Sequence, residues 1–445
     1  MTIVEAAAAL RSRQVSCLEL TNRCLDQIAK LNPRLNAFLT VTEEAARKRA
    51  SELDRDLAHG IDHGPLHGIP IAHKDLVWTR GVRTTSGSKL FADFVPASDA
   101  AVVEKLNRAG AVMLGKTGLH EIAYGVTSEN PHFGVIRNPR DLERSPGGSS
   151  GGSGAAVAAS MAFMATGTDT GGSIRIPASF CGVVGLKPTY GAVDRAGIQP
   201  LGFSLDHVGP LTRTAADASL TFHAMAEPRH VRPAPPGIQN LRIGLPENFY
   251  LSSLDPEVKQ AVENAARIAE QLGARVSSVR VPDIDALNAA GRVILLAEAS
   301  ALYEPYWNRR DDFGADVLAL LDQGRLVPAT DYVNAQRLRR SVLKDFHALF
   351  ASIDCLFTPT TPITAPLIGQ KQVELDSQMV DTRLATTRLV RGINVLGFPA
   401  LSLPCATSAG GLPIGLQMIA RPWEEALLLT LGQALEPQLP PQRPM

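Results

Sequence analysis

Hydrophobic positions recur along this chain with two spacings, one typical of helices and one typical of buried strands. After Ser16, apolar residues follow at the 3.6-residue period of a helix, and Glu19 stands at the spacing of a capping box. Residues 66–75 form a short apolar run that ends in two charges, Lys74 and Asp75. Such a run predicts a buried strand with a polar end.

The two patterns alternate over most of the sequence. We expect residues 1–58 to be mainly helical, with one of these helices at 43–57. The further helices predicted are 100–109, 154–164, 255–272, 284–303 and 331–350. The strands predicted are 36–41, 66–75, 111–115, 242–245, 275–281, 356–358 and 400–404. This alternation favours an α/β fold with a mixed or mostly parallel sheet covered by helices. A proline-rich stretch, 227–237, predicts an internal linker, and 436–445 a flexible tail.

Composition narrows the function classes. The chain has 445 residues, of which 45% are hydrophobic, and Lys plus Arg equals Asp plus Glu at 44 each. A net charge of zero and 5% aromatic residues argue against nucleic-acid and anionic-membrane partners. Five scattered cysteines without a Cys-x-x-Cys pair argue against disulfides and a zinc site. Without a basic leader or a long apolar run, we expect a cytoplasmic protein.

The most informative segment is 145–177. It contains two glycine-rich serine loops, Ser-Pro-Gly-Gly-Ser-Ser-Gly-Gly and Gly-Thr-Asp-Thr-Gly-Gly-Ser, on either side of an alanine-rich stretch. Glycine lets a substrate carbonyl approach backbone N–H groups, and a serine hydroxyl can attack that carbonyl. The pair indicates acyl chemistry.

Two familiar motifs match the sequence but not their required context. Residues 110–117 fit the phosphate-binding loop pattern, yet the four intervening residues are themselves a predicted strand, so we reject nucleotide hydrolysis. Residues 147–151 fit the Gly-x-Ser-x-Gly nucleophile elbow, but the polar residues 141–146 before it are a poor strand. Asp206 and His207 could supply the acid and the histidine that this motif needs. Because they are adjacent in the sequence, they cannot easily line up one behind the other beside a single serine.

A third interpretation needs no histidine. The backbone N–H groups of Thr170, Gly171, Gly172 and Ser173 can turn toward one oxygen and form an oxyanion hole. Ser173 would need a base, and Lys74 is the candidate because burial lowers the pKa of a lysine toward its neutral, proton-accepting form. The alternative is that Lys74 is a surface charge closing a strand.

Five blocks of the sequence resemble the amidase signature family. They are residues 68–75, 145–152, 167–177, 180–188 and 411–417, and the likeness extends from about residue 5 to 430. The resemblance implies a single large α/β domain over 1–435, with a mixed, twisted central sheet between layers of helices. Within it, the catalytic blocks would fall in 66–215 and a pocket-forming half in 240–435.

The resemblance also implies a Ser–cis-Ser–Lys triad. Ser173 would be the nucleophile, Ser149 would follow a cis peptide and relay the proton, and Lys74 would be the base. The same likeness marks Ser150, Asp169 and Arg175 as supports for the two loops. Neither a metal nor an organic cofactor is required.

We therefore expect a serine amidohydrolase that cleaves a linear C–N bond in a small molecule, with anilides, carbamates (urethanes) and esters as further substrates. Tyr124 and Gly125 are candidate substrate-binding residues, Tyr124 being equally well explained as a core aromatic. A homodimer is compatible with the sequence.

Two alternatives remain. One is the A-type glutaminase subunit of a glutamyl-tRNA(Gln)/aspartyl-tRNA(Asn) amidotransferase, which needs an acidic group to recognise the glutamine ammonium. Residues 386–394 hold two arginines and no carboxylate, which disfavours it. The other is a non-catalytic binding protein on the same fold, disfavoured because Lys74, Ser149 and Ser173 are all present.

Overall fold

A computed structural model describes residues 1–440. The α-helices are α1 (Ile3–Arg11), α2 (Cys17–Leu35), α3 (Glu43–Ala58), α4 (Ala101–Arg108), α5 (Gly151–Ala158), α6 (Arg175–Cys181), α7 (Ala215–Met225), α8 (Pro256–Gln271), α9 (Ile284–Tyr303), α10 (Ala315–Arg325), α11 (Ala329–Ser352), α12 (Thr382–Thr387), α13 (Arg391–Leu396) and α14 (Glu425–Leu435). Short 3-10 helices are η1 (Lys89–Phe91), η2 (Glu121–Ala123), η3 (Pro228–His230), η4 (Glu304–Asp312) and η5 (Glu436–Gln438).

The strands are β1 (Phe38–Val41), β2 (Pro70–Lys74), β3 (Val112–Thr117), β4 (Glu129–Asn130), β5 (Gly134–Val135), β6 (Met164–Asp169), β7 (Val184–Lys187), β8 (His207–Thr212), β9 (Arg242–Pro246), β10 (Arg275–Val279), β11 (Cys355–Pro359), β12 (Gln372–Leu375), β13 (Gln378–Asp381), β14 (Ala400–Thr407) and β15 (Pro413–Ala420). Eleven of them form one sheet in the order β1-β3-β2-β6-β8-β7-β14-β15-β11-β9-β10.

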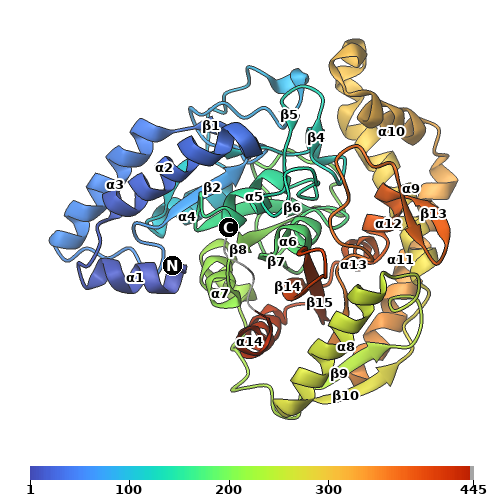
Figure 1. Ribbon diagram of the computed structural model, residues 1–445. Helices are drawn as coiled ribbons and strands as arrows, with labels where there is room; N and C mark the ends of the chain where they lie inside the picture. Colours follow the sequence, from blue (N-terminus) through green and yellow to red (C-terminus); the bar gives the residue numbers. More distant parts are fainter. Residues whose placement is uncertain (441–445) are drawn as a thin grey trace.

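This sheet is mixed and runs through the whole molecule (Figure 1). β2 is parallel to both β3 and β6, whereas β8 is antiparallel to β6 and β7. α5 packs on β6, α7 packs on β8, and α14 packs on β14. α2 and α3 pack on β3 near the β1 edge, and α8 packs on β10 at the other edge (Figure 1). The predicted fold class, a mixed sheet between layers of helices, is confirmed.

Local sequence signals explain where several helices begin. The Glu19 backbone N–H donates to the Ser16 hydroxyl at 3.0 Å, and the Ser16 N–H donates to the Glu19 carboxylate at 2.7 Å, which is the predicted capping box. α8 begins with Asp255 as its cap and Pro256 in its first turn, as the pattern predicts.

The prediction of a helix over 154–164 was wrong in its bounds. α5 begins three residues earlier, inside the glycine-rich loop, and ends at Ala158. The chain then turns at Ser160, which has a φ of 55°, and β6 begins at Met164. β6 was missed because its residues, Met-Ala-Thr-Gly-Thr-Asp, show neither alternation nor a continuous apolar run. Their burial comes from the strands and helices on every side.

The proline-rich stretch 227–237 contains η3 and connects α7 to β9. The segments on either side of it share one sheet, because β14 from the second half pairs with β7 from the first. Of the expected flexible tail, 441–445 lies outside the described residues. Before it, η5 covers 436–438, and Leu439 is buried.

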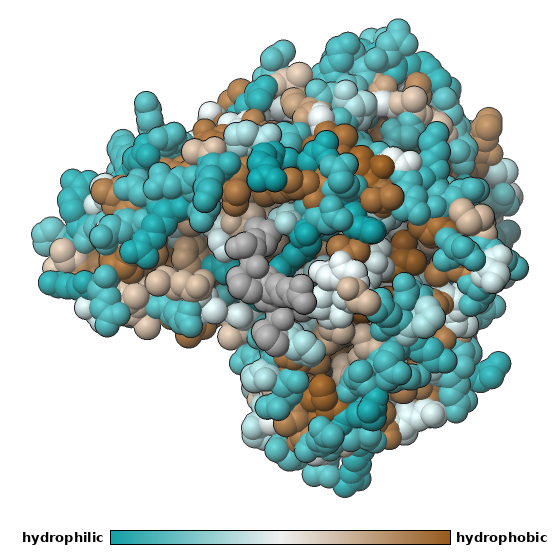
Figure 2. Space-filling view, viewed as in Figure 1, coloured by the Kyte–Doolittle hydropathy of each residue, from teal (hydrophilic) through white to brown (hydrophobic). Residues whose placement is uncertain are grey.

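Hydrophilic and hydrophobic residues are interspersed over the face of the molecule in Figure 2. Within residues 1–440, no helix is both long and apolar enough to cross a bilayer.

The start of α5 tolerates only glycine at position 152. A Cβ there would lie 2.5 Å from the Gly118 carbonyl oxygen and 2.6 Å from that of Ala37. Both are backbone atoms, so they cannot rotate away. The absence of a side chain therefore lets α5 approach the loop after β3.

We expect Gly152→Ala to lower the free energy of unfolding by about 2 kcal/mol or more, because overpacking against a fixed backbone is destabilising. Urea denaturation measures the change. The matched control is Gly410→Ala, where the nearest atom to a new Cβ is a side-chain oxygen 3.8 Å away. Equal stabilities of the two variants would contradict the close approach.

Candidate active site

Three chain segments meet at the carboxyl ends of β2 and β6. These strands are parallel neighbours, with Ile71 opposite Met164 and Ala72 opposite Ala165. Lys74 is the last residue of β2, and the Asp-Thr-Gly-Gly-Ser loop leaves β6 directly. Parallel strands present their carboxyl ends at the same edge of a sheet, so the register brings Lys74 to the serine loops.

The Lys74 ammonium group is fully buried and contacts only hydroxyls. Its Nζ lies 2.8 Å from Ser149 Oγ, 2.9 Å from Ser150 Oγ and 2.8 Å from Thr168 Oγ1. Burial lowers its pKa from 10.5 to about 7, although the charges of Asp169 and Asp206 oppose the shift. The surface-charge alternative for Lys74 is excluded by this burial.

The hydroxyl contacts suit a neutral amine. A neutral amine has two N–H donors and one lone pair, so one of its three neighbours must donate to it. The Ser150 hydroxyl donates to the Thr168 carbonyl at 3.2 Å and so accepts from Lys74. The remaining hydroxyls, those of Ser149 and Thr168, are therefore the possible donors to the lone pair.

The two serine loops are joined by their backbones. The Ser150 N–H donates to the Ser173 carbonyl at 3.2 Å, and the Gly148–Ser149 peptide bond is cis. Ser149 is fully buried, whereas Ser173 retains 6% exposure. Among the described residues, no hydrogen bond joins the Ser149 and Ser173 hydroxyls.

The four-donor oxyanion hole requires a correction at Gly172. Its N–H donates to Asp169 Oδ1 at 2.7 Å and is therefore already engaged. Its φ of +117° turns the chain so that this bond can form. Within residues 1–440, no hydrogen-bond acceptor is found for the N–H groups of Thr170, Gly171 and Ser173, so these three remain the candidate donors.

Asp169 and Arg175 form a fully buried ion pair beside the loop that carries Ser173. Arg175 Nη2 lies 2.9 Å from Asp169 Oδ1, and Arg175 Nε donates to Oδ2 at 3.0 Å. Asp169 also accepts from the Ile174 N–H. Burial alone would raise the pKa of Asp169, but the Arg175 charge and these bonds hold it well below its usual range.

Tyr124 lines a cavity of about 220 Å³. Arg391 also lines it, and its Nε would lie 3.9 Å from a Cβ at Gly171 in the loop that carries Ser173. Gly125 does not line this cavity: it packs on His120, whose ring would lie 2.1 Å from a Cβ at position 125.

His207, weighed as a partner for Ser149, lies near the Leu205 and Asp169 backbone oxygens instead. Within residues 1–440, no group of three or more His, Cys, Asp or Glu side chains is arranged to hold a metal ion.

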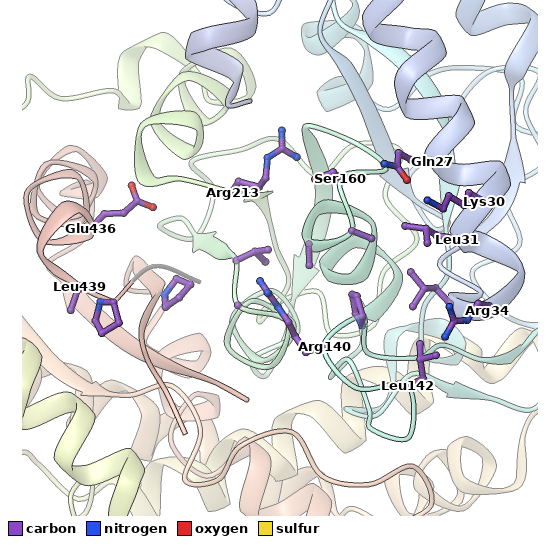
Figure 3. Close-up of a pocket in the computed structure, with 18 residues that line it drawn as sticks. Gln27, Lys30, Leu31, Arg34, Arg140, Leu142, Ser160, Arg213, Glu436 and Leu439 are labelled. Atoms are coloured by element: carbon purple, nitrogen blue, oxygen red, sulfur yellow. The ribbon is translucent and has the colours of Figure 1, made fainter. Parts of the chain in front are cut away.

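A larger cavity, of about 630 Å³, lies elsewhere in the molecule. Figure 3 shows Lys30 and Arg34 from α2 on one side of it, Glu436 and Leu439 on the other, and Arg140 between them. None of its lining residues is a candidate catalytic residue.

Comparisons with known proteins identify the family. The family model described as Amidase matches residues 19–429. This chain belongs to the amidase family. It is 38% identical to the A-type subunit of the glutamyl-tRNA(Gln) amidotransferase from Carboxydothermus hydrogenoformans, over 97% of this chain and 96% of the relative. It is 42% identical to the same kind of subunit from Azoarcus sp., over 96% of each chain.

Two solved structures show how closely the amidase fold is matched. One, described as a vestigial protein complex that reveals the evolutionary origins of an s-triazine catabolic enzyme, has a TM-score of 0.95, 37% identity and full coverage of both chains. The other, the peptide amidase from Stenotrophomonas maltophilia, has a TM-score of 0.85 and 32% identity, covering 100% of this chain and 98% of that one.

Sequence reasoning missed several residues that complete the site of this amidase. Asn394 Nδ2 donates to Asp169 Oδ1 at 2.8 Å, and Gln417 Oε1 accepts from Arg175 Nη1 at 2.6 Å. Gln417 lies in one of the blocks that carry the family resemblance, which was a usable signal. Thr168 gave none, because a threonine in a glycine-rich segment has many possible roles.

We expect Asp169→Asn to destabilise this amidase by about 3–5 kcal/mol, because it leaves the buried Arg175 charge without its partner. Chemical denaturation followed by circular dichroism measures the loss. Asp322→Asn is the control, since Asp322 pairs with Arg310 at 2.8 Å on the surface, where an ion pair contributes about 1 kcal/mol or less. Similar losses in both variants would contradict a structural role for the buried pair.

Proposed function

We propose that this member of the amidase family hydrolyses a small linear amide through an acyl-enzyme on Ser173. The observation that carries the proposal is the buried Lys74 amine, which contacts three hydroxyls and whose pKa burial lowers to about 7. A neutral amine in this position is a base for serine chemistry that needs neither histidine nor metal.

In the proposed mechanism, the Ser173 hydroxyl attacks the substrate carbonyl carbon. Its proton passes to Ser149 Oγ while the Ser149 proton passes to Lys74 Nζ. The N–H groups of Thr170, Gly171 and Ser173 stabilise the oxyanion of the tetrahedral intermediate.

The C–N bond then breaks, and the leaving nitrogen takes a proton from Ser149, which Lys74 replaces. Water then attacks the resulting ester and gives a proton through Ser149 to Lys74. Lys74 returns a proton through Ser149 to the Ser173 oxygen as the acid leaves. Esters, anilides and carbamates pass through equivalent intermediates, so we include them as possible substrates.

A second candidate follows from the relatives named as A-type subunits of an amidotransferase, which match this chain almost end to end. In that role the chain would release ammonia from glutamine as one component of a larger enzyme. Glutamine hydrolysis by the isolated chain, and its dependence on added partner subunits and charged tRNA, distinguishes this candidate from a stand-alone amidase.

We expect Ser173→Ala to lower kcat by roughly a thousandfold or more, because the variant cannot form the acyl-enzyme. Lys74→Ala should lower it by about 10²–10⁴, the range of a general base, and Ser149→Ala should retain some turnover through water. Release of amine from a panel of amides, anilides and carbamates, and of alcohol from esters, measures the effect, and circular dichroism checks the fold.

Labelling by a fluorophosphonate probe provides an independent test. The probe should modify the wild-type chain at Ser173 and leave Ser173→Ala unmodified. Undiminished turnover by purified Ser173→Ala would refute the assignment, and absence of labelling with no turnover would favour the non-catalytic alternative.

The pH dependence follows from Lys74. Only the neutral amine accepts a proton, and its fraction rises as the pH rises through a pKa of about 7. For a neutral amide, kcat/KM should therefore increase about tenfold per pH unit below this pKa and level off above it. Stopped assays from pH 5 to 9 measure the profile, and a flat profile over that range would contradict a lysine base.

A further inference from the structure

The cavity beside the nucleophile loop is unusually rich in positive charge. Arg292 on α9, Arg383 on α12 and Arg391 on α13 all line it. The lining holds one carboxylate, that of Asp381, which already accepts from the Leu384 N–H as the cap of α12. The lining therefore carries a net positive charge, although Asp316, which bonds His120, also acts on Arg383 from outside the lining.

These arginines lack the partners that arginines in folded proteins normally have. Within residues 1–440, neither Arg383 nor Arg391 forms an ion pair or donates a hydrogen bond, and Arg383 only stacks over the Tyr124 ring at 5.6 Å. Arg292 reaches Gln323 at 3.4 Å, a long and uncharged contact. A partly buried guanidinium without an acceptor is costly, which points to an anion that occupies this position in the working enzyme.

Arg391 keeps its charge under ordinary conditions. Burial and the nearby charges of Arg383 and Arg292 lower its pKa to about 10. This is still well above neutral pH, so the guanidinium is protonated and available to a carboxylate.

Residues that line the cavity are close neighbours of the 170–173 loop. A Cβ at Gly171, whose N–H is one of the three free donors, would lie 3.9 Å from Arg391 Nε. A second contact runs through Gly202. A Cβ added at this glycine would lie 2.9 Å from Cδ1 of Leu295, which also lines the cavity, and 3.4 Å from Cγ2 of Thr170 in the loop. A carbonyl held by the loop would therefore be only a few atoms from a group held by Arg391.

We propose that the substrate is a short amide whose acyl part carries a carboxylate, which Arg391 and Arg383 bind while the scissile carbonyl lies against the 170–173 loop. The cavity of about 220 Å³ is smaller than the sites of drug-sized ligands, which favours a compact acid over a long acyl chain. The inference depends on the proposed function for its chemistry, but the anion site is measurable without turnover.

The first experiment compares succinamate with succinamide, which has the same shape but no charge. Ammonia release should give succinamate a kcat/KM at least about tenfold higher, mainly through KM, since the carboxylate is bound alike in the ground and transition states. Arg391→Gln and Arg383→Gln should each remove most of this preference, so that the two substrates are used with similar kcat/KM.

Arg267→Gln is the matched control, because Arg267 is an exposed arginine on α8 that does not line the cavity. It should keep the full preference for succinamate. Equal use of succinamate and succinamide by the wild-type enzyme, or a preference unchanged in both cavity variants, would overturn the inference.

The second experiment measures binding without catalysis. Calorimetric titration of Ser173→Ala with succinate should show binding that weakens at least about thirtyfold when Arg391→Gln is added, the loss expected when one partner of a buried charge pair is truncated. If succinate binds in this way but no amide is cleaved, the anion site stands and the proposed function fails. If amides are cleaved but succinate does not bind, the proposed function stands and the anion site is refuted.

Discussion

The candidate site depends on keeping one amine out of water without giving it a carboxylate. Lys74 is fully buried, and its nearest polar neighbours are hydroxyls. An ion pair in the same position would hold the proton on nitrogen and raise the pKa. Hydroxyls satisfy the hydrogen bonds of the amine, and they leave it able to gain or lose a proton near neutral pH. The charges of Asp169 and Asp206 act on it from a distance and are outweighed by burial.

Nearby carboxylates are kept from Lys74 by partners of their own. Asp169 is held by Arg175, by backbone N–H groups and by Asn394. The Thr170 hydroxyl donates to Asp206 at 2.6 Å. The same contacts fix the turn between β6 and α6, so one network both shapes the loop that carries Ser173 and keeps these carboxylates from pairing with Lys74. The Gly172 N–H belongs to this network, which explains why it is not available to a substrate.

The sequence predicted the fold class, most of the helices and the loops that meet at the site. It did so because amphipathic periods, capping residues such as Ser16 and glycine-serine runs are local signals. β6 was missed because its burial is imposed by neighbouring strands and not by its own pattern. The engagement of the Gly172 N–H depends on a φ of +117° that glycine permits but does not require. The arginine-lined cavity combines α9, α12 and α13, and residues brought together over such separations leave no periodic signal.

The loop that carries Ser173 is completed by residues from far along the chain. Asn394 and Gln417 contact Asp169 and Arg175 across more than 200 positions. During synthesis, the nucleophile segment therefore leaves the ribosome long before the side chains that hold its turn. An early fragment containing all three candidate catalytic residues lacks the contacts that fix their geometry, so reactivity is tied to completion of nearly the entire polypeptide.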